Sequence, residues 1–136
     1  MTSEGREQVV SEELRVAREE LAAADQLVAI KLYRIAMTRL YFATFHSARA
    51  VLYAQGYDPK THQGVLTLFN QHLVRPGHFE PLAARVLARL QKYREQADYG
   101  ESFVVDLEGV QEEAGAARQF VERAEQFAQQ SILRQP

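Results

Sequence analysis

Apolar residues recur with helical spacing along most of the chain, and one stretch is apolar on almost every side. This stretch runs from Ala36 to Ala54 and reads AMTRLYFATFHSARAVLYA. A helix that is apolar all round is surrounded by protein, so the stretch predicts a central helix. Arg39, His46 and Arg49 interrupt it. Because a charge inside a packed core is costly unless it is paired or used, these side chains are the first candidates for a functional role.

The same spacing predicts helices over most of the remaining sequence. Helices are expected at residues 8–28, 29–55, 61–73, 81–98 and 106–133. Gly56 suits a helix C-terminus, Thr61 and Asp106 can each begin a helix, and Pro81 fits a first helical turn. Residues 99–105 are the one strand-like piece, too short and isolated to form a sheet. The prediction is an all-α, up-and-down bundle of about five helices.

Length and composition are those of one globular domain. The chain has 136 residues, 46% of them apolar, and we expect a single domain over residues 1–136 with its core at about 8–130. The absence of cysteine excludes disulfides and zinc–thiolate sites. We expect a cytoplasmic protein, because the N-terminus lacks a leader-like apolar stretch and no apolar run reaches membrane-spanning length. A net charge of −2 gives no overall attraction for nucleic acid, so any contact with RNA would be local.

A first candidate site lies at the end of the fourth predicted helix, in the sequence YREQADY. Arg94 and Asp98 are four residues apart and can meet on one helix face. One interpretation is an ordinary ion pair at a helix end. The other is that Arg94 binds phosphate, a role suited to its forked donors, while Asp98 and Tyr99 fix its direction.

A second candidate site is the sequence Thr61-His62-Gln63-Gly64 at the beginning of the third predicted helix. Free backbone N–H groups at a helix N-terminus attract anions, and His62 could add another donor. The alternative is that His62 is a solvated or capping residue, which is common in a first turn.

The third candidate is the stripe formed by Arg39 and His46, which lie two turns apart on nearly the same face. Its alternative interpretation is a buried hydrogen-bonded network that fixes how the helices pack. The other histidines, His72 and His78, do not have the spacing of a metal site, and no metal is predicted. No phosphate-binding loop, dinucleotide fingerprint or recognisable nucleophile motif is present, so no cofactor is expected.

Taken together, these motifs resemble the HEPN domain, a small helical domain of prokaryotes and some eukaryotes. The strings RLYFATFHSARAVLYAQGYDPKTHQGVLTLFNQHLV and YREQADYGESFVVD carry the resemblance, which covers residues from about 8 to 130. It implies a helical bundle that commonly forms homodimers. It also implies a frequent partner, a minimal nucleotidyltransferase encoded beside it, often as a toxin–antitoxin pair.

Many HEPN proteins are metal-independent ribonucleases that use an arginine followed, after four to six residues, by a histidine. The counterpart of that arginine is Arg94, but Tyr99 stands where a histidine would come first, and no histidine follows His78. Acid–base cleavage of RNA needs a group that exchanges protons near neutral pH, and tyrosine, with a pKa of about 10, does so poorly. His46 or His62 could approach Arg94 across the bundle.

The sequence is therefore interpreted as a non-catalytic module, without a cofactor, that binds a nucleotide, a minimal nucleotidyltransferase partner, or both. The resemblance makes Arg94, Asp98 and Tyr99 the edge of a ligand cleft, followed by His62, Arg39 and His46. A homodimer that joins the ends of the fourth helices would bring two Arg94 side chains together. Two alternatives stay open: a ribonuclease toxin with an altered site at Arg94 and Tyr99, and a purely structural interaction bundle.

Overall fold

The computed structural model describes residues 2–99 and 104–133 and confirms an all-α fold. The helices are α1 (Ser3–Ala29), α2 (Tyr33–Ala54), α3 (His62–Phe69), α4 (Pro81–Asp98) and α5 (Leu107–Leu133), with a π-helical turn η1 (Asn70–Val74) directly after α3. No strand occurs in the part of the chain that the structure describes.

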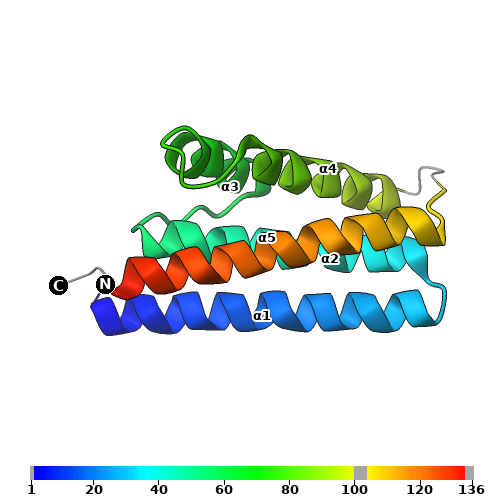
Figure 1. Cartoon of the computed structure of the whole chain (residues 1–136), viewed down its shortest axis with the longest axis horizontal. Helices are drawn as coiled ribbons and strands as arrows, with labels where there is room; N and C mark the ends of the chain where they lie inside the picture. The colour runs from blue at the N-terminus through cyan, green and yellow to red at the C-terminus, as the bar shows by residue number, and fades with distance from the viewer. Residues whose placement is uncertain (1, 100–103, 134–136) are drawn as a thin grey trace.

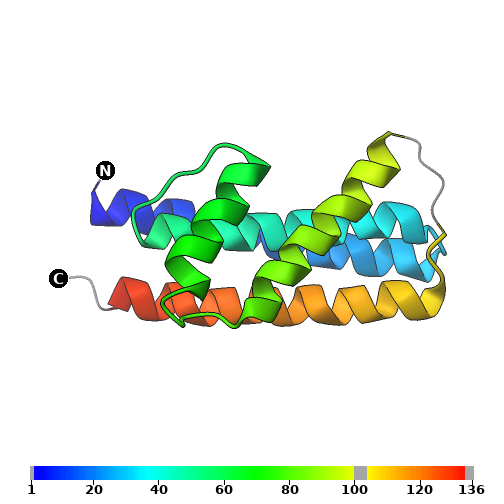
Figure 2. The same cartoon turned by 90° about the horizontal axis from the view of Figure 1, so that it is seen from above.

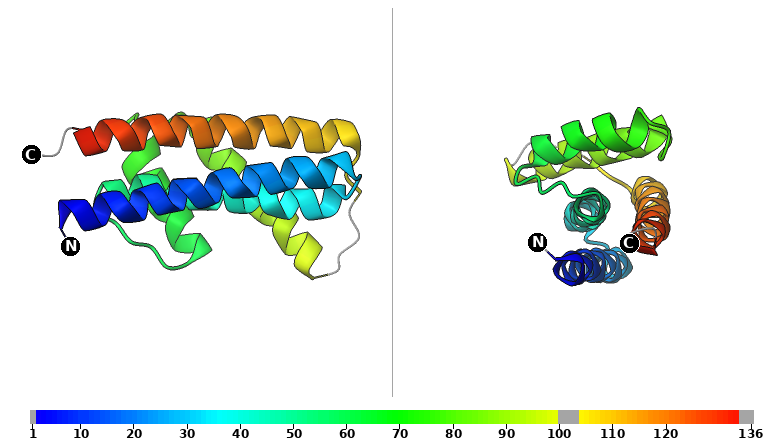
Figure 3. Two further views of the ribbon diagram at one scale, coloured as in Figure 1. Left: turned by 90° about the horizontal axis from the view of Figure 1, so that it is seen from below. Right: turned by 90° about the vertical axis from the view of Figure 1, so that its left-hand side faces the viewer.

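Helix α2 is the central element of the bundle. It packs against α1, α3, α4 and α5. Helices α1, α2 and α5 run side by side along the long axis of the molecule, with α1 antiparallel to the other two (Figure 1). Helices α3 and α4 form a second layer on one side and cross the long helices obliquely (Figure 2). The end-on view in Figure 3 shows α2 between α1 and this second layer. The apolar stretch therefore forms the central helix that the sequence predicts.

Small side chains line the contacts among the three long helices. Ala17 and Ala24 of α1, Ala36, Ala43 and Ala50 of α2, and Ala117 and Ala124 of α5 are all 0% exposed. Within each helix these alanines are seven residues apart, so they lie on one face. We call this set the alanine seam. Because alanine has only a methyl group, the seam lets the helix backbones approach closely, and larger apolar residues such as Leu40 and Val121 fill the space beside it.

The connection between α1 and α2 differs from the prediction. The boundary between the two helices was expected at residues 28 and 29 with no intervening turn, but the chain turns sharply over Ile30, Lys31 and Leu32. The Leu32 N–H donates to the carbonyl of Leu27 at 2.8 Å, and Lys31 adopts the left-handed backbone conformation with φ +64°. This is a helix-ending motif that usually contains glycine. The pattern did not reveal it because Ile30 and Leu32 are apolar and no glycine or proline is present.

The other helix ends follow their local signals more closely. Helix α4 begins at Pro81 and ends at Asp98, as predicted, and α2 ends just before Gly56, whose φ is +94°. The Asp106 carboxylate caps α5 by accepting from the Gly109 N–H at 2.8 Å. Helix α1 begins at Ser3, five residues earlier than predicted, and Val10 is one of its buried residues.

Residues 99–105 were interpreted as strand-like, but the described residues among them do not form a strand. Tyr99 lies in a turn, and residues 104 and 105 have no regular secondary structure. Residues 100–103 lie outside the described part of the chain. In the third predicted helix, the α-helical hydrogen bonding gives way to the π-helical turn at Asn70, which carries the chain to Val74.

Candidate functional site

Arg94 and Asp98 form the ion pair that their spacing predicts. Arg94 Nε lies 3.2 Å from Asp98 Oδ2 in the last turn of α4. The Arg94 side chain is 23% exposed, so it is held against the protein surface but remains accessible to solvent. Tyr99 does not help to hold it, because Tyr99 is 81% exposed. The guanidinium instead lies near the rings of Tyr41 and Phe42, at 5.6 and 5.7 Å from their centroids.

His62 lies against Arg94, although 32 residues separate them in the sequence. Thr61 caps α3 by accepting a hydrogen bond from the Gly64 N–H at 2.9 Å, and His62 is the first residue of that helix. Its Nε2 lies 3.1 Å from Arg94 Nη1. The imidazole also packs on the ring of Phe45, with 4.8 Å between centroids. The structure thus joins two of the sequence candidates in one site, which we call the Arg94–His62 site.

The hydrogen bonds around His62 determine where its proton lies. Arginine nitrogens only donate, so His62 Nε2 must accept from Arg94. The proton of the neutral imidazole is then on Nδ1, which donates to the hydroxyl oxygen of Tyr41. Tyr41 is buried in α2 and cannot move away easily. The site therefore fixes one tautomer of His62, with the Nε2 lone pair facing Arg94.

The electrostatic surroundings keep His62 and Tyr41, the two partners of the hydrogen bond at Nδ1, uncharged. Burial lowers the pKa of His62, and the positive charge of Arg94 lowers it further. Burial also raises the pKa of the Tyr41 hydroxyl, despite the opposing effect of Arg94. At neutral pH, His62 is therefore a neutral imidazole and Tyr41 a neutral phenol. Arg94 is the one permanent charge among the three.

Arg39 reaches the edge of this site but is engaged elsewhere. Its guanidinium lies 5.1 Å from the centroid of Phe42, a ring that Arg94 also approaches. Arg39 Nη1 pairs with Glu20 Oε2 of α1 at 3.0 Å. The charge of Arg39 is therefore matched by a carboxylate that is itself largely buried.

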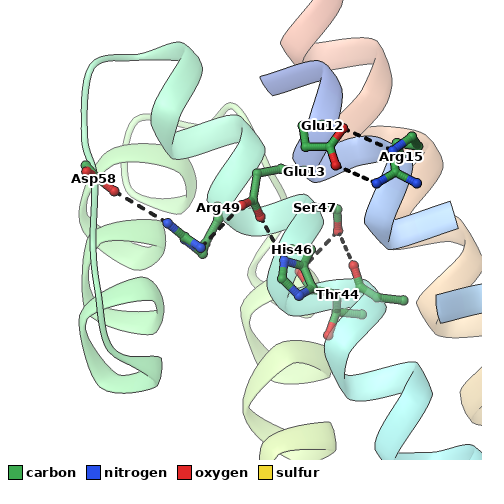
Figure 4. Close-up of polar contacts among 9 residues, drawn as sticks. Glu12, Glu13, Arg15, Thr44, His46, Ser47, Arg49 and Asp58 are labelled. Carbon is green, nitrogen blue, oxygen red and sulfur yellow. Dashed lines mark hydrogen bonds and ion pairs between the residues drawn. The ribbon is translucent and has the colours of Figure 1, made fainter. Parts of the chain in front are cut away.

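His46 belongs to a separate network between α2 and α1, shown in Figure 4. His46 Nδ1 lies 2.8 Å from Glu13 Oε2, and the other oxygen of Glu13 is 3.3 Å from Arg49 Nη1. Arg49 Nη2 lies 3.5 Å from Asp58 in the loop before α3. Because His46 is bonded to Glu13 and not to Arg94, the structure favours the interpretation of His46 as part of a packing network. Of the two histidines that the sequence offered as possible neighbours of Arg94, His62 is the one that contacts it.

The sequence analysis missed Tyr41, Phe42 and Phe45 as parts of the site, because their spacing is that of core residues. One signal was available for Tyr41. A buried tyrosine hydroxyl needs a hydrogen-bond partner, and so a tyrosine in an otherwise apolar helix indicates a polar group nearby.

Neither a metal-binding cluster nor a membrane-spanning helix occurs in residues 2–99 and 104–133. Within these ranges, no three histidine, aspartate or glutamate side chains lie close enough together to hold a metal ion. No helix in the same ranges is both long and apolar enough to cross a membrane.

Comparison with known proteins places these observations in a family. The HEPN domain model matches residues 10–131. A candidate toxin from Methanocaldococcus jannaschii is 40% identical over 86 residues, which cover 63% of this chain and 64% of that protein. A UPF0332 protein from Pyrococcus horikoshii is 35% identical over 78 residues, covering 57% of this chain and 55% of that protein.

The length of the match varies among the relatives. The chain spans less than two thirds of those two proteins. It covers 92% of a UPF0332 protein from Thermotoga maritima, with 30% identity over 122 residues and 90% of this chain aligned. Since the domain model covers most of the sequence and the bundle has the expected helices, the chain belongs to the HEPN domain family.

Proposed function

We propose that this HEPN protein is a module of the toxin–antitoxin type, and that its Arg94–His62 site binds a phosphate group of a nucleotide or of RNA. The names of two relatives, both candidate toxins from Methanocaldococcus jannaschii, support the general class. The observation that carries the phosphate proposal is the position of Arg94, which is held by surrounding groups and whose one carboxylate partner among residues 2–99 and 104–133 is Asp98.

The charge balance at Arg94 favours an anion. Asp98 contacts the Nε side of the guanidinium, and its own side chain is 47% exposed, so solvent weakens the pair. On the Nη1 side the partner is His62, which is neutral and accepts a hydrogen bond without cancelling the charge. A phosphate oxygen would accept the same hydrogen bond and supply a negative charge as well.

The proposed partners follow from the family resemblance. We propose a homodimer in which the ends of α4 face one another, so that two Arg94 side chains form a positive groove. Like charges at such an interface repel unless acids or a bound anion lie between them, and Asp98 is placed to serve as one such acid. A minimal nucleotidyltransferase, acting with this protein in the cytoplasm, is the proposed second partner.

A second candidate function is metal-independent cleavage of RNA. The observation that favours it is the contact of His62 with Arg94, because His62 supplies the histidine that is absent after Arg94 in the sequence. When a phosphodiester binds Arg94, His62 Nε2 is freed to accept the proton of the ribose 2′-hydroxyl. The 2′-oxygen then forms a bond to phosphorus, the bond to the 5′-oxygen breaks, and that oxygen takes a proton from water. Arg94 stabilises the negative charge that develops on the phosphoryl oxygens.

The test is a pair of measurements on purified protein with a chelator present throughout: binding of a fluorescent single-stranded RNA, and cleavage of total RNA. The variants are Arg94→Ala and His62→Asn. The control is Arg89→Ala, because Arg89 lies on the same helix and pairs with Glu113 at 2.8 Å. Circular dichroism melting verifies that each variant is folded.

The outcomes distinguish phosphate binding, cleavage of RNA and a purely structural role. Binding that is lost in Arg94→Ala and retained in Arg89→Ala supports the phosphate site. Cleavage that is lost in His62→Asn while binding persists supports the ribonuclease, and the non-catalytic interpretation then fails. If the parent protein neither binds nor cleaves RNA and does not bind nucleotides, and Arg94→Ala lowers only stability, the structural bundle is the correct interpretation.

A further inference from the structure

Exposed apolar side chains gather at the end of the bundle where α1 turns into α2 and α5 begins. They are Ile30 (65% exposed), Leu32 (43%), Ile35 (41%), Val104 (97%) and Leu107 (44%), and we call them the end patch. Figures 1, 2 and 3 all place these two connections at the same end of the molecule. In the rest of the described chain, the exposed large apolar side chains are Leu82 and Tyr99. A cluster of this kind is uncommon on a monomer and marks an interaction surface.

A shallow pocket lies within the end patch. It has a volume of about 360 Å³ and is lined by Leu32, Ile35 and Val104, together with Tyr33 and Val105. Its shallow shape fits one or two apolar side chains better than a whole small-molecule ligand, because ligand cavities usually enclose most of the ligand. The α1–α2 connection and the segment before α5 both contribute to its walls.

The charged residues of this pocket are Lys31 and Arg34, and both are positive and exposed. Neither forms an ion pair with a carboxylate among residues 2–99 and 104–133. Four other arginines of α1 and α2, Arg15, Arg18, Arg39 and Arg49, each contact a glutamate, whereas Arg6 near the start of α1 has no ion pair among the described residues. Two cations that have no ion pair within the described residues therefore flank an apolar pocket.

The backbone at Lys31 adds to this picture. Lys31 has φ +64°, a conformation that costs a residue with a side chain roughly 1 kcal/mol and that glycine adopts freely. Lys31 therefore occupies a backbone position at which glycine is the preferred residue. Strain of this kind is often found where a side chain has a role in binding.

We propose that the end patch docks a segment of a protein partner in which an apolar side chain lies between carboxylates. The apolar side chain would fill the pocket between Leu32, Ile35 and Val104, and the carboxylates would pair with Lys31 and Arg34. Such an arrangement has the apolar centre and charged rim of a specific interface. The proposal goes beyond the Arg94–His62 site and does not depend on what that site binds.

Charge and chemistry argue against two other occupants. In a symmetric contact between two copies of this patch, the Lys31 and Arg34 side chains of both copies would lie in one interface and repel each other. RNA would use aromatic rings for stacking and several phosphate contacts, whereas this patch is mainly aliphatic. An acidic protein segment satisfies both the apolar pocket and the two cations.

The test selects peptides from a random phage-displayed library on the full-length protein and measures their affinities by fluorescence anisotropy. We expect enrichment of peptides with leucine, isoleucine or phenylalanine near aspartate or glutamate. Ile35→Asp should weaken their binding about tenfold or more, as removal of a central anchor does. The double variant Lys31→Glu, Arg34→Glu should reduce it similarly. Leu82→Asp is the control, since Leu82 is an exposed leucine (51%) in the first turn of α4, outside the end patch.

Each other outcome overturns the proposal. Enriched peptides that are neutral or basic, peptides whose affinity changes equally in Leu82→Asp, or no enrichment at all would remove its basis. Sedimentation that shows a dimer dissociating in Ile35→Asp would assign the patch to a second copy. Loss of RNA binding in the charge-reversal variant, with peptide binding unchanged, would assign it to RNA. Thermal melting verifies that the variants fold, and because these side chains are exposed, little change in stability is expected.

Discussion

The hydroxyl group of Tyr41 stabilises the His62 tautomer that the hydrogen bond from Arg94 requires, and replacing Tyr41 with phenylalanine tests this directly. The substitution keeps the aromatic ring, which packs on Phe42 and Phe45, and removes only the oxygen that accepts the proton of His62 Nδ1. In Tyr41→Phe the Nδ1–H group loses the hydrogen-bond partner that it has among the described residues. The imidazole proton is then free to move to Nε2, where it would oppose the hydrogen bond from Arg94.

The structure gives an approximate size for the effect. A buried donor left without a partner costs about 1–3 kcal/mol. His62 is half-buried, so water can partly replace the lost acceptor, and we expect a loss of about 1–2 kcal/mol of unfolding free energy. With an unfolding entropy of about 2.1 cal/mol/K per residue, a chain of 136 residues loses roughly 3–7 °C in Tm.

Two assays measure the two effects. Urea unfolding followed by circular dichroism gives the loss of stability, and nitrogen-15 NMR of the imidazole reports which ring nitrogen carries the proton. The control is Tyr53→Phe on the same helix, because the Tyr53 hydroxyl has no hydrogen bond among the described residues. A loss below about 0.5 kcal/mol, together with a proton that remains on Nδ1, would refute the role of Tyr41 in stabilising this tautomer.

Three further predictions concern other parts of the molecule. Because the pKa of His62 is lowered on folding, the unfolded chain takes up the proton first as the pH falls. The unfolding free energy should therefore be constant with respect to this group above about pH 6.5 and decrease below it. Urea unfolding of His62→Asn across this range should show a weaker decrease. Glu13→Gln should cost about 1–3 kcal/mol of unfolding free energy, since it leaves His46 and Arg49 without their shared carboxylate in a partly exposed site, and an unchanged urea midpoint would contradict the network. Lys31→Gly should stabilise the protein by about 0.5–1 kcal/mol because it relieves the positive φ; a lower Tm would show that the Lys31 side chain itself stabilises the turn.

The fold could be predicted largely because its signals are local. Pro81 and Gly56 mark helix ends through their backbone preferences, and Arg94 meets Asp98 because residues four apart share a helix face. The turn at Lys31 was missed for the same reason, since the signal that would mark it, a glycine, is absent there. The π-helical turn after α3 also lacks a local signal.

The candidate site could be predicted only in part. Arg94 and His62 were each identified from their own helix, but their contact depends on how α3 and α4 lie across α2, which no local spacing encodes. Tyr41 was assigned to the core, and it is indeed buried. Its second role, as the acceptor for His62, depends on a residue 21 positions away.

The alanine seam between α1, α2 and α5 has a practical consequence for genetics. Replacing one of its buried alanines, such as Ala17, with leucine inserts a larger side chain into a fully buried position, at a cost of about 1–3 kcal/mol. A cost of that size leaves most domains folded at low temperature and unfolds many of them on warming. The seam is therefore a place to build temperature-sensitive alleles that leave every residue of the Arg94–His62 site and the end patch intact, so that the whole protein can be switched off in a growing culture by heat alone.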